Sequence, residues 1–298
     1  MVFKVLRFLF SAIGLLALFL RYEVNAQTMP CGVLHEAPES IAARENRILQ
    51  IKQQFAETFQ NANHTVQYIP IKAHILRKSD GTGGLSLADL NTALFQINRY
   101  YINVGSGVQF YLCSAPNYIN NTAFYDYDNT EETALCNAND VNNAISLYFP
   151  NSILFGSLAV SGYAYFPSTL SVTNRVFVQA AYAIDTRTLT HELGHYFNLL
   201  HTFQSSTDVN QTNREYVTRD VMQGANCANK GDLLCDTPAD PYGRDSLSLV
   251  GCSYAGTARD PQGQLYSPSL SNIMSYYPIS CGNTFTSGQY NRMNDGLL

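Results

Sequence analysis

The segment His-Glu-Leu-Gly-His-Tyr-Phe-Asn-Leu-Leu-His, residues 191–201, decides how this chain folds around its site. His191 and His195 are four positions apart, so in a helix their side chains lie on one face and can bind one ion together. Glu192 lies beside that face, where its carboxylate can take a proton from a water molecule at the ion. Three neutral imidazoles with one open position are typical of a catalytic zinc. The segment therefore predicts a zinc-binding helix.

The third histidine, His201, can reach the same ion only if the chain turns sharply after the helix. Asn198 lies midway between His195 and His201, where a left-handed residue would make that turn. Glycine adopts this conformation at the lowest cost, and asparagine is the next best tolerated. The alternative is a polar helix face with solvated histidines. It explains poorly why three of the chain's six histidines lie so close together.

Composition indicates a folded protein that does not bind nucleic acid. The chain has 298 residues, of which 46% are hydrophobic and 14% charged, and it could form one large domain or two small ones. Its formal net charge of -5 provides no basic surface for a nucleic acid. We therefore expect no nucleic-acid partner.

The N-terminus has the pattern of a secretory signal. Lys4 and Arg7 precede the apolar run 8–20, and the small residues 24–26 would allow cleavage before Gln27. We predict that residues 1–26 are a signal peptide and that the protein is secreted, to the extracellular space or a periplasm. An uncleaved anchor is the alternative, but the apolar run is short for a membrane span. No stable membrane insertion is expected after signal removal.

Seven cysteines suit the oxidising compartments that a secreted protein meets. Cys31 lies apart near the N-terminus, and the other six can pair in many ways. The pairs that we favour are Cys113–Cys136, Cys252–Cys281 and Cys227–Cys235.

Residues 27–65 are predicted to be a separate pro-segment ahead of a catalytic domain at 66–298. Within the segment, residues 41–59 have apolar side chains at helical spacing. The asparagine-rich residues 61–63 would form an exposed joint.

In the catalytic domain we predict five strands and two helices. The expected strands are 66–76, 108–113, 144–149, 162–166 and 176–180. Pro70 indicates an edge or a bulge in the first strand. Ser86 and Asp89 resemble a capping box that opens a helix through about Tyr101. The side chains expected to face inward from that helix are Leu87, Leu90, Leu94 and Ile97.

The rest of the chain is expected to consist of a connection, the zinc helix and long loops. Residues 114–143 are expected to form a Tyr- and Asn-rich connection, and the zinc helix should start near Asp185 with 188–200 as its body. From Phe203 to about Ser271 there is little periodicity, which indicates long loops that are functional or externally braced.

Four short motifs resemble the pappalysin (cytophagalysin) family of metzincin zinc metalloproteases. That family has the pattern HExxHxxGxxH followed by Thr-Phe, and residues 191–203 match it except that Asn198 stands in place of glycine. The other matches are Cys235-Asp236-Thr237-Pro238, the Met-turn sequence 272–276, and residues 281–293. The matches follow the family's order from about residue 66 to the C-terminus.

The resemblance implies a fold of class α/β (α+β). An upper subdomain, to about residue 198, would hold a mixed, mostly parallel sheet and the active-site helix. A lower subdomain, from about residue 199, would be irregular, disulfide-braced and closed by a C-terminal helix.

The resemblance also implies a zinc endopeptidase that hydrolyses internal peptide bonds, so its partners would be protein or peptide substrates. His191, His195 and His201 would bind Zn2+, and Glu192 would activate the water. Tyr276 would stabilise the oxyanion, and Met274 would form an apolar floor beneath the imidazoles. The strand at 162–166 would pair with the substrate.

Two other functions are open. If the chain failed to turn at Asn198, Glu215 would be the third ligand, as in thermolysin-like peptidases. The chain could also be a secreted binding module that keeps zinc only for structure. Glu192 argues against this, because a structural site needs no general base and is usually closed by a fourth protein ligand.

Two regulatory or structural features are also predicted. Cys31 could occupy the open position on the zinc until the pro-segment is removed, since thiolate is a good zinc ligand. The resemblance further suggests a structural Ca2+ near Asp232, Asp236 and Thr237, which offer oxygen ligands.

Overall fold

The computed structural model describes residues 31, 38–54, 66–102, 107–168, 173–245 and 248–296. The predicted signal peptide and the joint at 61–63 lie outside the described residues. Among the described residues, no helix combines the length and apolar character that a membrane crossing requires.

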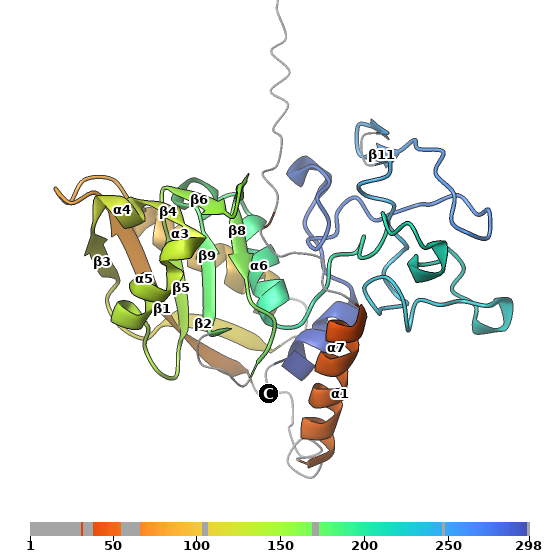
Figure 1. Ribbon diagram of the computed structural model, residues 1–298, viewed down its shortest axis with the longest axis horizontal. Coiled ribbons are helices and arrows are strands. Elements are labelled where there is room, and N and C mark those ends of the chain that lie inside the picture. Colours follow the sequence, from red (N-terminus) through yellow and green to blue (C-terminus); the bar gives the residue numbers. More distant parts are fainter. Residues whose placement is uncertain are drawn as a thin grey trace, which may run out of the picture.

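The centre of the fold is a six-stranded, mostly parallel sheet (Figure 1). Its main path has the order β2-β1-β5-β9-β8, and β3 pairs with the far end of β1. Every pairing is parallel except that of β8 with β9. The strands are β1 (Gln67–Arg77), β2 (Val108–Leu112), β3 (Asn117–Asn120), β5 (Ile145–Phe149), β8 (Gly162–Ala164) and β9 (Arg175–Val178).

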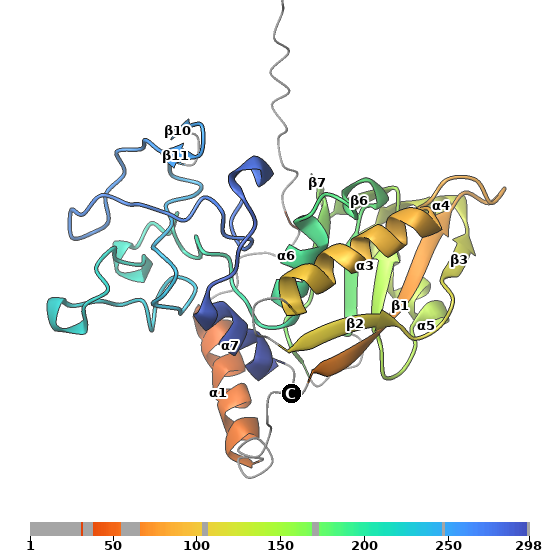
Figure 2. The ribbon, with the colours of Figure 1, turned by 180° about the vertical axis from the view of Figure 1, so that it is seen from behind.

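Side-chain alternation along these strands builds a core on each face of the sheet. One core holds Ile71, Ala73 and Ile75 of β1 with helix α3 (Leu87–Ile102) and helix α6 (Thr188–Tyr196). The core on the opposite face holds Leu76, Tyr148 and Phe177 with helix α5, and Figure 2 shows α3 lying across the first face. Helix α5 spans Glu132–Asn139.

The five predicted strands are all present, with ends that differ by up to a few residues. Pro70 lies in the half of β1 that pairs with β2 alone, because the pairing with β5 begins at Ile71. That half therefore behaves as an edge, which is where proline is tolerated. Ser86 does cap α3, since the backbone N–H of Asp89 donates to its Oγ at 3.1 Å. Leu87 was predicted wrongly, because it is 51% exposed in the first turn of that helix.

The predicted connection at 114–143 is wrong. It contains β3, α4 (Thr122–Tyr125), β4 (Asp126–Asp128) and α5, and β4 begins a separate sheet of order β4-β6-β7. Strand β6 spans Ser152–Phe155 and β7 spans Leu158–Ala159. These elements are too short to show a periodicity in sequence.

The part of the chain after α6 is mostly irregular (Figures 1 and 2). Its short strands are β10 (Leu249–Val250) and β11 (Ser253–Tyr254), its 3-10 turns are Gln211–Asn213, Val221–Gln223 and Ile279–Cys281, and helix α7 is Ser287–Gly296. The disulfides Cys227–Cys235 and Cys252–Cys281 brace this part, as predicted.

The predicted Cys113–Cys136 disulfide is wrong. Both thiols are free: Cys113 is exposed just after β2, while Cys136 is buried on α5 in the second core. A pairing inferred from sequence order cannot take account of this difference in position.

Helix α1 (Pro38–Gln54) is the described part of the predicted pro-segment. It starts three residues earlier than expected, and the predicted end at residue 59 lies outside the described residues. Figures 1 and 2 both show α1 side by side with α7, so this segment lies against the C-terminal helix.

Candidate active site

The first part of the site is the start of α6, which Asp185 caps. The backbone N–H groups of Arg187 and Thr188 donate to Asp185 Oδ1 at 3.0 and 2.7 Å. Such bonds satisfy the N–H groups that an α-helix leaves without partners at its N-terminus. Residues 189–195 of the helix are buried, so the helix carries the first two histidines into the interior.

The helix ends at Tyr196 rather than at residue 200 as the sequence analysis predicted. Asn198 has φ 75, the left-handed conformation that we expected at this position. The N–H of Leu199 donates back to the carbonyl of Gly194 at 2.8 Å, closing the last turn. The chain then reverses toward α6 and brings in His201.

The three histidines meet at one point. The Nε2 atoms of His191 and His201 each lie 3.1 Å from that of His195 and 3.3 Å from one another. All three side chains are almost completely buried.

The orientation of the rings fits a cation. Nδ1 of His191 lies 2.7 Å from the carbonyl of Ile273, and Nδ1 of His195 lies 2.7 Å from that of Leu199. A carbonyl only accepts, so in both rings Nδ1 carries the proton and the lone pair is on Nε2. Lone pairs brought this close repel one another unless a positive ion lies between them. In histidines that bind a metal, the ring nitrogen that does not face the metal is usually hydrogen-bonded to such a carbonyl.

Burial also adjusts the charges of the site. It lowers the pKa of His191 to about 4, which favours the neutral imidazole that a metal needs. It raises the pKa of the Glu192 carboxyl to about 8, an effect that a hydrogen bond from Cys31 partly opposes. Oε1 of Glu192 is buried without a hydrogen-bond partner among the described residues.

Cys31 lies directly at this point. Its Sγ donates to Oε2 of Glu192 at 3.2 Å, and it forms a four-member group with the three histidines whose ligand atoms lie within 4.8 Å of one another. Among the described residues this is the one group of three or more His, Cys, Asp or Glu side chains arranged to hold a metal. Cys31 also makes a parallel bridge to Gly162, the first residue of the edge strand β8.

Gly162 allows β8 to lie directly against α6. A Cβ at this position would lie 2.7 Å from the carbonyl oxygen of Phe177 and 3.0 Å from Cγ of Glu192. A side chain would therefore push the edge strand away from the glutamate.

The Met-turn forms the floor of the site. Met274 is fully buried, and its Sδ would lie 2.5 Å from a Cβ on Gly194, so only glycine fits on the helix above it. The N–H of Thr202 donates to the carbonyl of Met274 at 3.1 Å and ties the third histidine's segment to the turn. Two residues further, the Tyr276 hydroxyl lies 3.0 Å from Nε2 of His201 and accepts the N–H of Cys31 at 3.2 Å.

Sequence reasoning missed Asp240, which organises the same region. Oδ2 of this buried carboxylate accepts from Thr202 at 2.6 Å and from Ser275 at 2.7 Å. Oδ1 accepts from the hydroxyl of Tyr277 at 2.8 Å and from the N–H of Tyr242 at 2.9 Å. Asp240 therefore joins the His201 segment to the Met-turn. Its partners come from separate parts of the chain, so no spacing could have revealed it.

Arg187 is a second residue that the sequence did not single out. Its guanidinium donates to Oδ1 of Asn283 at 2.7 Å and to the carbonyls of Gly282, at 2.6 Å, and Tyr277. The buried side chain thus fixes the start of α6 to the loop that follows the Met-turn.

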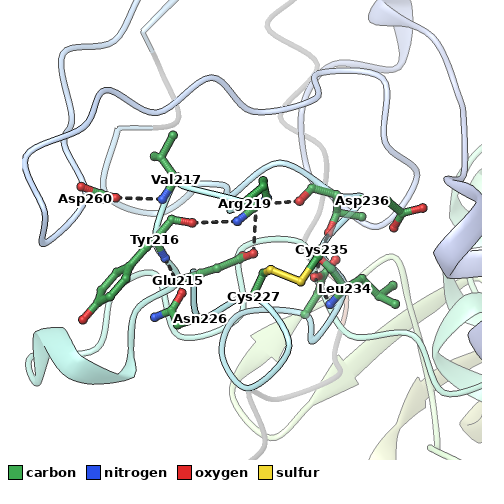
Figure 3. Close-up of polar contacts among 12 residues, drawn as sticks. Glu215, Tyr216, Val217, Arg219, Asn226, Cys227, Leu234, Cys235, Asp236 and Asp260 are labelled. Atoms are coloured by element: carbon green, nitrogen blue, oxygen red, sulfur yellow. Dashed lines mark hydrogen bonds and ion pairs between the residues drawn. A yellow bond between two sulfur atoms is a disulfide. The ribbon is translucent and has the colours of Figure 1, made fainter. Parts of the chain in front are cut away.

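The structure places Glu215 outside the histidine group, so it is not an alternative third ligand. Figure 3 shows Glu215 paired with Arg219 at 3.0 Å beside the Cys227–Cys235 disulfide. Asp236 also has a separate task, since it accepts from the N–H of Gly288 at 2.6 Å at the start of α7. Of the three predicted calcium residues, Asp232 and Thr237 are therefore in contact, at 2.9 Å, while Asp236 binds the start of α7.

The fold and the geometry of the histidine site together define a class of protein. A mostly parallel sheet with an antiparallel edge strand, two helical histidines, a third after a left-handed turn and a buried methionine below them together describe a metzincin-like metalloprotease.

Comparisons with known proteins agree. A family model described as peptidase M43, pregnancy-associated plasma protein-A, matches residues 128–298, more than half of the chain. An extracellular metalloprotease of Podospora anserina is 27% identical over 300 residues, covering 89% of this chain and 87% of the relative. One from Pyricularia oryzae is 28% identical over 286 residues, with the same coverage.

Among solved structures, a mutant of Tannerella forsythia promirolysin matches 89% of this chain and 92% of its own, with a TM-score of 0.54 and 16% identity. That likeness concerns the fold. The chain belongs to the M43 (pappalysin) family, which confirms the predicted resemblance, and it is a metalloendopeptidase.

Proposed function

We propose that this protein is a secreted, zinc-dependent endopeptidase made as a latent precursor. His191, His195 and His201 bind the zinc, and Glu192 is the general base. The observation that carries the proposal is the convergence of three buried Nε2 atoms beside a carboxylate with an unpartnered oxygen. The relatives' description as extracellular, together with the N-terminal sequence pattern, supports secretion.

The donor set fits zinc, because neutral imidazole nitrogens with one open position are typical of its catalytic sites. When bound, zinc lowers the pKa of a water molecule and polarises the scissile carbonyl. Glu192 takes the proton of the attacking water at a carboxylate oxygen and later delivers it to the amine that leaves. Its buried Oε1, which has no hydrogen-bond partner among the described residues, is the oxygen that would accept the proton.

The substrate backbone pairs with the free edge of β8, next to Glu192. An extended peptide adds to such an edge through main-chain hydrogen bonds. The Tyr276 hydroxyl, which lies beside His201, donates a hydrogen bond to the carbonyl oxygen as its charge grows. Met274 shapes the apolar floor without touching the substrate.

In the precursor, Cys31 keeps these groups from a substrate. Its thiol lies at the histidines and bonds to Glu192, its N–H occupies the Tyr276 hydroxyl, and its backbone bridges to β8. One residue thus covers the general base, the oxyanion donor and the substrate edge. Release of the N-terminal segment would expose all three.

We also propose that the protein binds calcium. Its ligands are Asp232, as expected, and Glu215, which takes the place expected for Asp236. Both side chains are buried. Oε1 of Glu215 pairs with Arg219, whereas Oε2 of Glu215 and Oδ2 of Asp232 have no hydrogen-bond partner among the described residues. Burial raises the pKa of both carboxyls, so an ion that binds them would relieve that cost. Thr237 supports Asp232 by donating to its Oδ1 at 2.9 Å.

Digestion of casein by the processed enzyme, with zinc measured on the same sample, tests the proposed function. Glu192→Gln should retain stoichiometric zinc yet lose a factor of about 100 to 10,000 in rate, the usual contribution of a general base. Glu131→Gln, which makes the same change far from the histidines, is the control and should digest normally. Undiminished cleavage by Glu192→Gln would refute the proposal. Bound zinc without any cleavage by the wild type would also refute it, and would indicate a binding module instead.

A further inference from the structure

Helix α1 makes a specific polar contact with the turn that carries the third histidine. Nε of Arg44 donates to Oδ1 of Asn198 at 2.7 Å, and Nδ2 of Asn198 donates to Oε1 of Glu45 at 3.2 Å. Both ends of the asparagine amide are therefore bonded to adjacent residues of α1. Asn198 is 1% exposed, so water does not compete for these bonds.

Arg292 of α7 completes the cluster. Its Nη2 pairs with Oε1 of Glu45 at 2.5 Å, and its Nε donates to the carbonyl oxygen of Asn198 at 2.8 Å. Arg44 and Arg292 are both buried, and Glu45 contacts both Arg292 and Asn198. Charge-assisted hydrogen bonds of this kind are about twice as strong as neutral ones.

The side chain of Asn198 is what makes this contact possible. Because Asn198 has a φ of 75°, glycine would occupy this position at the lowest conformational cost. Glycine would leave the turn intact but would present nothing to Arg44 or Glu45. Asparagine tolerates the conformation and uses its amide to bind α1.

Arg44 also reaches the opposite wall of the site. Its guanidinium carbon lies 4.0 Å from the ring centroid of Phe166, and that ring contacts His195 edge-on. Beside this cluster, α1 borders a half-open pocket of about 300 Å³, which Ile41 and Glu45 line together with Gln204 and Asn229. Because the packing around α1 is incomplete at this pocket, we attribute the attachment of the helix to the polar contacts of Arg44 and Glu45.

We propose that the turn at Asn198 is a docking site for the chain's own helix α1, held by the cluster Arg44–Glu45–Asn198–Arg292. This goes beyond the latency of Cys31 but rests on the proposed function in treating the segment as a pro-segment. The N-terminal segment is anchored twice, by Cys31 at the histidines and by α1 at the turn. A cut between α1 and the catalytic part therefore does not free the site until α1 also dissociates.

Hydrogen–deuterium exchange of α1 in the full chain tests the anchor without using activity. The Glu192→Gln background prevents self-cleavage under the proposed function. Glu45→Ala should speed exchange of the α1 amides about tenfold, since it removes bonds to a buried arginine and to Asn198. Glu39→Ala removes the same group from an exposed position on the same helix and should change α1 exchange by less than about twofold. Equal effects of the two variants would overturn the proposal.

A double-mutant cycle between Arg44→Gln and Asn198→Gly identifies the contact itself. Asn198→Gly keeps the left-handed turn, and exchange of α3 amides reports whether the rest of the fold is unchanged. Arg44→Gln should accelerate α1 exchange clearly in the Asn198 chain but much less in the glycine chain. Additive effects would show that the residues act independently and would overturn the docking site. If proteolysis were absent but this coupling present, the proposed function alone would fail.

Discussion

At the scale of single residues, the site depends on where each lone pair and each proton lies. Backbone carbonyls fix the tautomers of His191 and His195, so that Nε2 faces the common point. The sequence predicted these histidines because their spacing has a direct geometric meaning in a helix. It could not predict that Asn198 also binds Arg44, because that contact joins residues far apart in the chain.

The role of Cys31 can be tested by removing its thiol. A Cys31→Ala precursor should show partial proteolysis before the segment is cut, because the substitution removes the thiol at the histidines and its bond to Glu192 but leaves α1 anchored at Asn198. Cys113→Ala removes an exposed free thiol and should leave the precursor latent. The measurement is the initial rate of peptide cleavage by freshly purified precursors. A Cys31→Ala precursor as latent as the control would contradict the switch.

At the scale of elements, the strands and helices with a clear period were predictable and the short ones were not. Helix α3 and strands β5 and β9 show the apolar spacing of their buried faces. Residues 114–143 hold five elements of three to eight residues, including the 3-10 turn Asn129–Glu131, and these are too short for a period to emerge. Leu87 shows a related limit, because the first turn of a helix can face solvent even where the apolar spacing continues.

Asp240 joins the His201 segment to the Met-turn, and its replacement should loosen both. Asp240→Asn puts an NH₂ where a carboxylate oxygen accepts, so at least one of the donors from Thr202, Ser275 and Tyr277 loses its partner. We expect a loss of about 1–3 kcal/mol in the free energy of unfolding, together with weaker zinc binding. Urea unfolding measures the free energy of unfolding, and competition with a chelator measures the zinc affinity.

Asp80→Asn, at an exposed turn, is the control and should lower the free energy of unfolding by less than about 0.5 kcal/mol. Unchanged unfolding and zinc affinity in Asp240→Asn would show that Asp240 does not hold the two segments together.

At the scale of the whole molecule, Figure 1 shows a regular sheet half and an irregular half, with α6 at the border between them. Composition and motif order predicted both halves. The disulfide framework was only partly predictable, because Cys113 and Cys136 lie in surroundings that sequence order does not reveal. The predicted oxygen ligands of a calcium ion were Asp232, Asp236 and Thr237, and the sequence did not indicate that Glu215 is a second buried carboxyl of this half beside Asp232.

This buried pair should make stability depend on pH in an unusual direction. Burial raises the pKa of both carboxyls, so the folded state binds more protons than the unfolded state above the ordinary carboxyl pKa near 4. In a calcium chelator, the stabilisation from these protons is present in mild acid and is lost as the pH rises through the folded pKa values. Thermal unfolding should therefore occur at a lower temperature at pH 8 than at pH 5.

Two controls identify the cause of that pH dependence. Glu215→Gln should flatten it in the chelator, because the variant has one less buried carboxyl to titrate. Added calcium should raise the unfolding temperature most at the higher pH, where the carboxylates are ionised. A wild-type curve that rises with pH in the chelator, or is unaffected by Glu215→Gln, would contradict the assignment.

X-ray absorption at the zinc edge of the purified precursor tests the central claim most directly. The account predicts one zinc per chain with three nitrogen neighbours from imidazoles and one sulfur neighbour, and loss of the sulfur in Cys31→Ala. Absence of zinc, or zinc with fewer than three imidazole neighbours, would contradict it.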